Sequence, residues 1–204
     1  MPLSIEELNK LKQAPVEGML PTIAHRWSPR AFSDKAVSAN DLKIILNAAR
    51  WAASSSNAQP WRFFVGVKGS ETHDKIFETL VGFNQGWANK PHVLLLGTAL
   101  RKDGKGNPNA YAEYDLGQAA VSLILQATAL GLATHSMGGF DHAAVRSSFN
   151  LTEDYSVGAV IAIGYQAAPA TLGNEQLHER EIAPRERKPL GEIALAAIGK
   201  PFEV

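Results

Sequence analysis

The sequence contains no cysteine among its 204 residues. This absence excludes disulfides, thiolate metal sites, iron–sulfur clusters and cysteine nucleophiles. Net charge is absent too, because 20 basic residues balance 20 acidic ones, so no overall field attracts nucleic acid or an anionic membrane. Any anion must therefore be bound locally, and any redox chemistry must come from a cofactor.

Long apolar runs are also missing. The longest, such as residues 93–96, are far too short to cross a bilayer, and residues 1–20 lack the apolar core of a signal peptide. We therefore expect a cytoplasmic protein with no membrane partner.

What the sequence does contain is typical of a globular domain: 45% hydrophobic and 20% charged residues, without repeats or a low-complexity linker. Helical periodicity alternates with apolar or β-branched runs, which favours an α+β or α/β fold in one domain. The predicted helices cover residues 41–51, 70 onward, 111–130 and 143–149, and the predicted strands cover residues 61–67, 92–100 and 157–165. Residues 82–90 are predicted to be irregular, and residues 136–140 to be a glycine-rich turn.

Both ends of the chain have distinctive patterns. Near the amino terminus, an amphipathic helix is predicted with Ile5, Leu8 and Leu11 on one side. Residues 180–204 combine basic residues with an apolar finish, which needs a surface to bury against. That surface is either a second subunit or the chain's own domain, and the sequence favours neither.

Arg26–Phe32 is the most informative segment, with the sequence RWSPRAF. Two arginines that flank a serine on a short turn are suited to binding a phosphate, because guanidinium groups match phosphate geometry and stay charged. Taken alone, the segment also fits an ordinary solvated loop, where most surface arginines lie.

Ser54–Trp61 is a second polar segment, with the sequence SSSNAQPW, and it follows the helix predicted at residues 41–51. It offers small uncharged polar groups at the end of a helix, because Pro60 prevents the helix from continuing. The two segments together suggest a phosphorylated ligand that carries a ring.

The histidines do not indicate a catalytic or metal site. His135 beside Ser136, and the pair Asp141 and His142, are more typical of polar caps, and none of the six histidines has ligand spacing. We therefore predict no metal and name no catalytic side chain.

Six segments, in order, give the chain a resemblance to the nitroreductase family of flavin mononucleotide (FMN) oxidoreductases. They are RWSPRAF (26–32), ARWAASSSNAQPW (49–61), NQGW (84–87), DLG (115–117), MGGF (137–140) and RKPL (187–190). The resemblance implies a three-layer α+β fold with a mostly antiparallel central sheet flanked by helices. It also implies an intertwined homodimer that binds FMN at the subunit interface.

The resemblance further assigns the phosphate-binding residues. Arg26, Ser28 and Arg30 would hold the FMN phosphate and the nearby flavin edge, and Arg187 would reach the phosphate from the tail. Trp27 would contribute a backbone contact at most. Residues from about 180 to 204 would form a C-terminal extension that packs on the partner.

The flavin and its ribityl chain are assigned to the other segments. Ser54, Ser55, Asn57 and Gln59 would line them from the partner subunit, and Asn84 would face the pyrimidine edge. The turn formed by Met137, Gly138 and Gly139 would direct a backbone amide at flavin N5, where glycine permits close approach.

The activity that the resemblance implies is hydride transfer from NADPH or NADH through FMN to a nitroaromatic, a quinone or a related small electrophile, with ping-pong kinetics. Two alternatives stay open. One is reduction of an activated alkene or of free flavin on the same scaffold. The other is a non-enzymatic flavin-binding or carrier protein.

Overall fold

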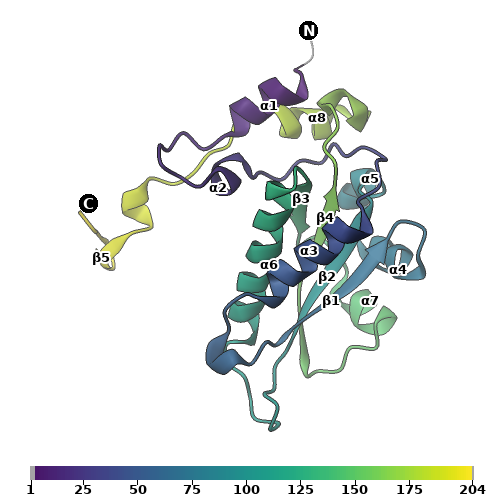
Figure 1. Cartoon of the computed structure of the whole chain (residues 1–204), viewed down its shortest axis with the longest axis vertical. Coiled ribbons are helices and arrows are strands. Elements are labelled where there is room, and N and C mark those ends of the chain that lie inside the picture. The colour runs from purple at the N-terminus through teal and green to yellow at the C-terminus, as the bar shows by residue number, and fades with distance from the viewer. Residues whose placement is uncertain (1–2, 204) are drawn as a thin grey trace.

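The computed structural model describes residues 3–203, and a four-stranded antiparallel sheet lies at its centre (Figure 1). The sheet order is β1-β2-β4-β3, and every neighbouring pair is antiparallel. The strands are β1 (Trp61–Val67), β2 (Val93–Leu100), β3 (Ala133–Met137) and β4 (Tyr155–Gly164). The predicted α+β class with an antiparallel sheet is therefore confirmed.

Helices cover both faces of this sheet and make three layers. Side chains alternate between the faces of a strand, and β2 shows this clearly. Val93 and Leu95 pack with α3 (Ala39–Arg50) and α6 (Ala112–Ala129). Leu94 and Leu96 pack in the second core cluster, which includes residues of α4 (Glu71–Thr79), α5 (Gly82–Ala88), α7 (His142–Ser148) and α8 (Glu175–Ile182). A strand buried on both faces explains the unbroken apolar run of β2.

The two helices on the first face begin and end where local chemistry sets their limits. The Oγ atom of Ser38 accepts a hydrogen bond from the backbone N–H of Asp41 at 3.0 Å, and this caps α3. Gly131 follows α6 with a φ of 73°, a left-handed conformation that glycine adopts without strain. The helices predicted at residues 41–51 and 111–130 are confirmed.

The predictions for two segments, residues 82–90 and 136–140, were wrong in part. Residues 82–88 form helix α5 rather than an irregular segment, because its residues Asn84 and Trp87 are buried against the core. Ser136 and Met137 belong to strand β3, which the sequence pattern missed, so the glycine-rich turn begins only at Gly138. In both places tertiary packing outweighs local propensity.

Three helices gather at one end of the sheet: α1 (Ile5–Lys12), α2 (Pro21–His25) and α8 (Glu175–Ile182) (Figure 1). Helix α8 was not predicted. The predicted apolar side of α1 was wrong, because Ile5 and Leu11 are exposed while Leu8 and Lys12 are buried. Burial of Lys12 depends on α8: its Nζ atom donates to the carbonyl of Ala183 just beyond that helix.

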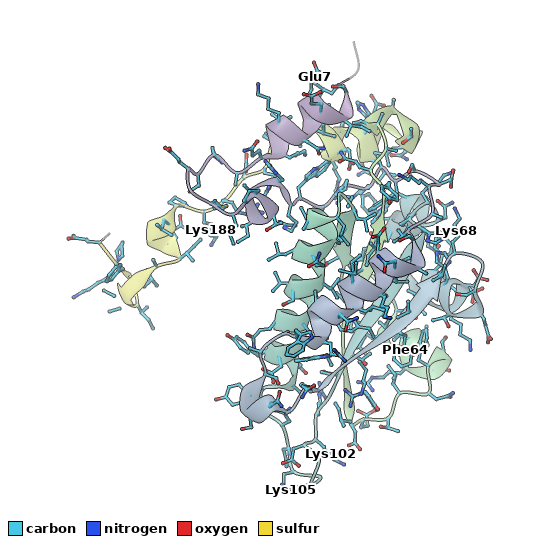
Figure 2. The ribbon with its side chains drawn as sticks, in the orientation of Figure 1. Glu7, Phe64, Lys68, Lys102, Lys105 and Lys188 are labelled. Atoms are coloured by element: carbon cyan, nitrogen blue, oxygen red, sulfur yellow. The ribbon has the colours of Figure 1, made fainter. Side chains whose placement is uncertain are left out.

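The carboxyl-terminal tail extends away from the sheet, as Figures 1 and 2 show for the yellow segment that carries Lys188. It contains η3 (Leu190–Glu192) and a small hairpin of β5 (Leu195–Ala197) and β6 (Lys200–Pro201). Its large apolar side chains are exposed: Leu190, Ile193, Leu195, Ile198 and Phe202. The predicted tail therefore divides: its start, in α8, packs on its own domain, whereas the part from Leu190 onward does not. Within residues 3–203, no helix has the length and apolarity needed to span a bilayer.

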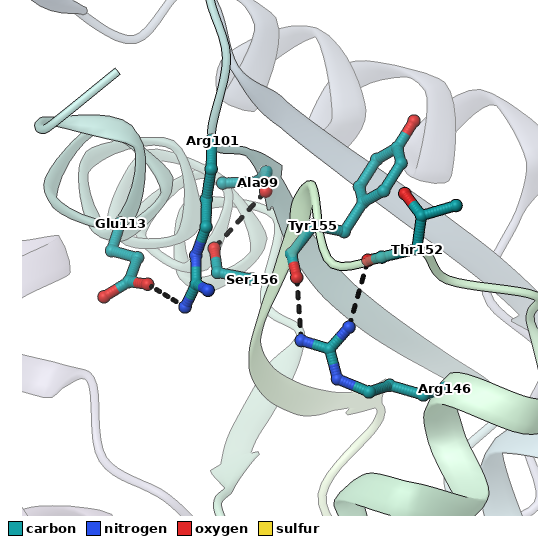
Figure 3. A network of polar contacts seen from close by, with 7 residues as sticks. All are labelled: Ala99, Arg101, Glu113, Arg146, Thr152, Tyr155 and Ser156. Atoms are coloured by element: carbon teal, nitrogen blue, oxygen red, sulfur yellow. Dashed lines mark hydrogen bonds and ion pairs between the residues drawn. The ribbon is translucent and has the colours of Figure 1, made fainter. Parts of the chain in front are cut away.

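The opposite end of the sheet holds two arginines that find acceptors within the chain (Figure 3). Arg146 donates to the carbonyls of Thr152 at 3.0 Å and Tyr155 at 2.8 Å, and Arg101 contacts the carboxylate of Glu113 at 2.9 Å. Beyond them a lysine-bearing loop, with Lys102 and Lys105, forms the lower tip in Figure 2. The remaining short elements are η1 (Ser55–Asn57) and η2 (Pro169–Leu172).

Candidate functional site

The Arg26–Phe32 segment runs from the end of α2 along the residues that follow β4. The N–H of Ala167 donates to the carbonyl of Ala31 at 2.8 Å, and the N–H of Ser33 donates to that of Tyr165 at 2.9 Å. Backbone pairing on this side fixes the path of the segment. It also leaves two backbone N–H groups, those of Arg30 and Ala31, directed elsewhere.

Two buried side chains hold the same segment from other elements. His135 on β3 lies 2.9 Å from the carbonyl of Pro29 through its Nδ1 atom, and its ring packs 4.6 Å from that of Trp87. Glu181 on α8 accepts from the N–H of Arg30 at 2.9 Å and from the N–H of Ala31 at 3.1 Å. Burial, followed by the charge of Arg30, lowers the pKa of His135 to about 4, so its ring is neutral near pH 7 and donates from Nδ1.

Five cationic side chains converge on a cavity of about 210 Å³ beside this segment. Among the described residues that line it there is no carboxylate. Arg26 donates through Nη1 to the Ser28 hydroxyl at 3.4 Å, so the two predicted phosphate donors are neighbours. The lining residues are Lys12, Arg26, Trp27, Ser28, Arg180, Arg185 and Arg187.

Electrostatics inside this cavity favour an anion. Burial, and then the charge of Arg187, lower the pKa of Arg26, and burial followed by Arg187 and Arg26 does the same for Arg185. A lowered pKa means that the charged form is disfavoured where it stands. A bound anion would reverse that effect, since opposite charge stabilises the protonated guanidinium.

Arg30 lies apart from Arg26. It lines a second cavity of about 440 Å³ together with Phe32, Trp87 and Lys90, and its Nε atom is buried without a partner. Phe83 lies between the cavities: its ring centroid is 5.8 Å from the guanidinium carbon of Arg30 and 4.9 Å from that of Arg180. The structure thus places the two predicted arginines on adjacent cavities rather than on one.

Trp27 is a structural residue in this chain. Its side chain is 9% exposed, its Nε1 atom donates to the Asn9 side chain at 2.8 Å, and the Nζ atom of Lys12 lies 4.8 Å from its ring centroid. These contacts join α1 to the Arg26–Phe32 segment. The side chain is therefore engaged, and its backbone remains the part that a ligand could contact.

The Ser54–Gln59 segment follows α3 and lies at the opposite end of α6 from α1 and α2 (Figure 1). The N–H of Ser55 donates to Asp115 in the first turn of α6 at 3.1 Å, whereas Thr128 in the last turn of α6 lines a pocket with Arg26. A helix rises about 1.5 Å per residue, so the 13 residue steps from Asp115 to Thr128 separate the two groups by roughly 20 Å along α6. One subunit does not bring them together.

The backbone of Ser54–Gln59 is itself unusual. Ser56, Asn57 and Gln59 have φ values of 52°, 54° and 46°. Non-glycine residues in this left-handed region cost on the order of 1 kcal/mol or more each and are often found at functional sites. The Ser54 hydroxyl accepts from the N–H of Gln59 at 3.1 Å and helps to hold the turn.

Asn84 and Gly139 form a tight contact on the flavin side of the predicted site. The Asn84 amide donates to the Gly139 carbonyl at 2.9 Å, and the N–H of Val81 donates to the same carbonyl at 3.1 Å. A Cβ atom at Gly139 would lie 2.8 Å from the Asn84 Nδ2 atom, so a larger residue there would have to displace the Asn84 amide. Gly138 is exposed, and a Cβ atom there would meet no other atom within 4 Å. The Met137 side chain is buried, so only the backbone of Met137 is available to a ligand.

The sequence patterns missed four residues of the cationic end: Lys12, Arg180, Glu181 and Arg185. Arg185 was detectable as part of the basic run that contains Arg187, and Arg180 as its neighbour. Lys12 and Glu181 were not detectable. Their contacts join positions about 150 to 170 residues apart, and neither residue has a motif around it.

Comparison with known proteins agrees with this architecture. The Nitroreductase family profile matches residues 23–165. A protein from Archaeoglobus fulgidus whose name includes NAD(P)H nitroreductase is 30% identical over 154 residues, which are 74% of this chain and 86% of that protein. An uncharacterized 15.4 kDa protein from Mycolicibacterium smegmatis is 33% identical over 65% of this chain and 93% of its own length.

Solved structures give the same result. A crystal structure described as an oxidoreductase containing FMN superposes with a TM-score of 0.84 at 35% identity, over 96% of this chain and 97% of that one. A Desulfovibrio desulfuricans protein described as a nitroreductase in complex with FMN superposes with a TM-score of 0.71 at 26% identity, over 91% and 99% of the two chains. The chain belongs to the nitroreductase family.

Proposed function

We propose that this member of the nitroreductase family is an FMN-dependent oxidoreductase. It would take a hydride from NADPH or NADH and reduce nitroaromatic, quinone or related small electrophilic substrates. The observation that carries the proposal is the cavity of about 210 Å³ lined by four arginines, one lysine and one serine. The FMN named for two structural relatives and the NAD(P)H named for the Archaeoglobus protein support it.

The donor set of this cavity fits the phosphate of FMN. A phosphate monoester carries close to two negative charges at neutral pH and three acceptor oxygens. Arg26, Arg185 and Arg187 would provide charge and forked N–H donors, and Ser28 would provide a hydroxyl. Arg180 and Lys12 complete the ring of cations around the same space.

The flavin would extend from there toward Arg30 and the Gly138–Gly139 turn. When bound, FMN supplies the hydride-accepting N5 atom and the capacity to store two electrons. The protein's own contribution would be positional: Arg30 supplies charge near the ring edge, and Asn84 holds the Gly139 carbonyl so that the turn keeps its backbone close to the ring. We name no catalytic side chain.

A homodimer would complete the site. Because Ser54, Ser55, Asn57 and Gln59 lie at the far end of α6 from the cationic cavity, we propose that a second copy supplies them. Exposed apolar residues offer surfaces for this contact, including Trp51, which is 79% exposed, and Tyr114, which is 69% exposed. In this proposal residues 1–204 are one FMN-binding domain with an extension from about residue 180. The first residues of the extension, through Arg185, pack on their own chain, and we propose that its exposed apolar residues from Leu190 onward pack on the partner.

The kinetic scheme that we propose is ping-pong, in which the nicotinamide leaves before the electrophile enters the same cleft. Reduction of an activated alkene or of free flavin would use the same arrangement. A flavin carrier would keep the cationic cavity but would not accept hydride from NAD(P)H.

The colour of the purified protein tests the proposal. A yellow protein that bleaches anaerobically on addition of NADPH or NADH supports the oxidoreductase. Colour without bleaching by either donor supports the carrier. A colourless protein that does not take up added FMN contradicts both.

A further inference from the structure

We infer that Glu181 is a positioning residue for phosphate binding: its buried carboxylate holds the backbone of the Arg26–Phe32 segment and thereby sets where Arg26 and Ser28 meet the ligand. The inference rests on the proposed function, because the phosphate in question is that of FMN. Nothing in the family resemblance pointed to this residue.

The geometry around Glu181 is unusually complete for a buried acid. The side chain is fully buried, and one carboxylate oxygen accepts from the N–H of Arg30 at 2.9 Å. The other oxygen lies 3.1 Å from the N–H of Arg30 and 3.1 Å from that of Ala31. Two successive backbone donors therefore converge on one carboxylate contributed by a helix about 150 residues later in the chain.

The carboxylate is needed because the backbone pairing with the residues after β4 provides no acceptor for the N–H groups of Arg30 and Ala31. Ala31 uses its carbonyl to pair with Ala167, which leaves its N–H to Glu181. Buried N–H groups without an acceptor are costly, and acceptors that carry charge form the stronger bonds. Burial raises the pKa of Glu181, while the N–H groups of Ala31 and Arg30 and the charges of Arg30 and Lys12 favour the ionised form.

Position along the segment connects this contact to the ligand. Arg30 and Ser28 are separated only by Pro29, whose ring restricts the backbone and whose carbonyl is held by His135. Tethers at Pro29, Arg30 and Ala31 leave the segment little freedom. A change at Glu181 would therefore move the Ser28 hydroxyl and the base of the Arg26 side chain.

Charge and position make opposite predictions for this residue, which makes the inference testable. As a plain negative charge near the cavity, Glu181 would repel a phosphate, and its removal would tighten binding. As a positioning residue, its removal would weaken binding, because the donors would no longer be aligned. The sign of the change separates the two roles.

The experiment compares Glu181→Gln with Glu181→Asp and with Glu179→Gln, which alters an exposed acid on the same helix. Each protein is stripped of flavin, and its dissociation constants for FMN and for riboflavin, which lacks the phosphate, are measured by flavin fluorescence. Hydrogen exchange at the amides of Arg30 and Ala31 is measured on the flavin-free proteins.

We expect Glu181→Gln to weaken FMN binding about tenfold, the effect of losing one well-aligned interaction, and to weaken riboflavin binding by a smaller factor, because riboflavin has only the flavin edge near Arg30 and no phosphate to lose. Glu181→Asp should fall between Glu181→Gln and the wild type, and Glu179→Gln should match the wild type. Exchange at Arg30 and Ala31 should accelerate in Glu181→Gln. If that variant does not fold, Glu181→Asp carries the same comparison.

Tighter FMN binding by Glu181→Gln, or equal losses for FMN and riboflavin, would overturn the inference. A failure of the proposed function has a different signature. In that case the wild type itself would bind FMN no more tightly than riboflavin, whatever the variants do.

Discussion

The two ends of the sheet differ in the partners that their arginines find. At the lower end, Arg146 and Arg101 each donate to acceptors of the same chain, two carbonyls for the first and the Glu113 carboxylate for the second (Figure 3). At the upper end, the arginines that line the cationic cavity form no ion pair with a carboxylate among residues 3–203. They are Arg26, Arg180, Arg185 and Arg187.

This contrast separates arginines whose partners all lie within the chain from a cluster of arginines that lacks a counter-charge. Within that cluster Arg185 also donates to the carbonyls of Lys12 at 2.7 Å and Ala24 at 3.4 Å, so it joins the tail to the amino-terminal helices as well. A guanidinium with internal acceptors contributes to stability in the free protein. Clustered guanidinium groups without a counter-charge are unfavourable: burial first, and then the charge of Arg187, lower the pKa of Arg26. A bound anion relieves that unfavourable interaction, and this relief adds to the free energy of anion binding.

The largest effect should come from acid, and at the cationic end. His135 has a pKa of about 4 in the folded protein against about 6.5 in the unfolded chain. As the pH falls through this window the unfolded chain takes up a proton first, so the free energy of unfolding falls by up to about 3 kcal/mol. Above pH 7 the ring is neutral in both states, and this loss of stability is absent.

His135→Asn, which keeps a donor near the Nδ1 position, should therefore show a shallower loss of stability between pH 6.5 and 4 than the wild type. Denaturant unfolding at several pH values measures it. Parallel curves for the two proteins across this range would show that the buried ring does not titrate as the structure implies.

Arg26→Ala should produce the next largest effect, on ligand binding. Loss of a charge-assisted contact to phosphate should raise the dissociation constant for FMN about thirtyfold, or about 2 kcal/mol. Arg50→Ala, at an exposed position that ends α3, is the matched control and should retain FMN as the wild type does. Equal retention of flavin by both variants would contradict the role given to the cavity.

Arg146→Ala should have the smallest effect of the three, and on a different property. Removing the donor leaves the carbonyls of Thr152 and Tyr155 without it, and the free energy of unfolding should fall by about 1 kcal/mol. Binding of FMN should not change. Thermal unfolding of the two flavin-free variants, Arg146→Ala and Arg26→Ala, measures which is the less stable. If Arg26→Ala is the less stable of the two, the difference that we describe between the two ends of the sheet is wrong.

Much of the fold was predictable because its elements carry local patterns. The Ser38 cap and the apolar stripe of residues 111–130 define α3 and α6, and alternating or continuous apolar runs define β1, β2 and β4. Helix α5 was missed because two glycines weaken its propensity, and β3 because its polar residues hide a short strand. Burial of Trp87 and pairing with β4 outweigh both local signals.

The candidate site divides in the same manner. Arg26 and Ser28 were predicted from the chemistry of their segment and Arg187 from the family resemblance, and all three line one cavity. The expectation that Arg30 shares it was too simple, since side-chain direction depends on packing that residue order does not specify. Asn84 was expected at the flavin edge, and in the structure its amide holds the Gly139 carbonyl.

By itself the sequence determined which chemistry is available: no thiols, no net charge, paired arginines around a serine, and glycine where the backbone must come close. Those properties belong to single residues and short segments, so they survive without a fold. Only the tertiary structure decided that Lys12, Glu181 and the tail arginines meet the Arg26–Phe32 segment, and that residues 54–59 do not. Contacts between distant segments depend on how whole helices pack, and no local pattern encodes that arrangement.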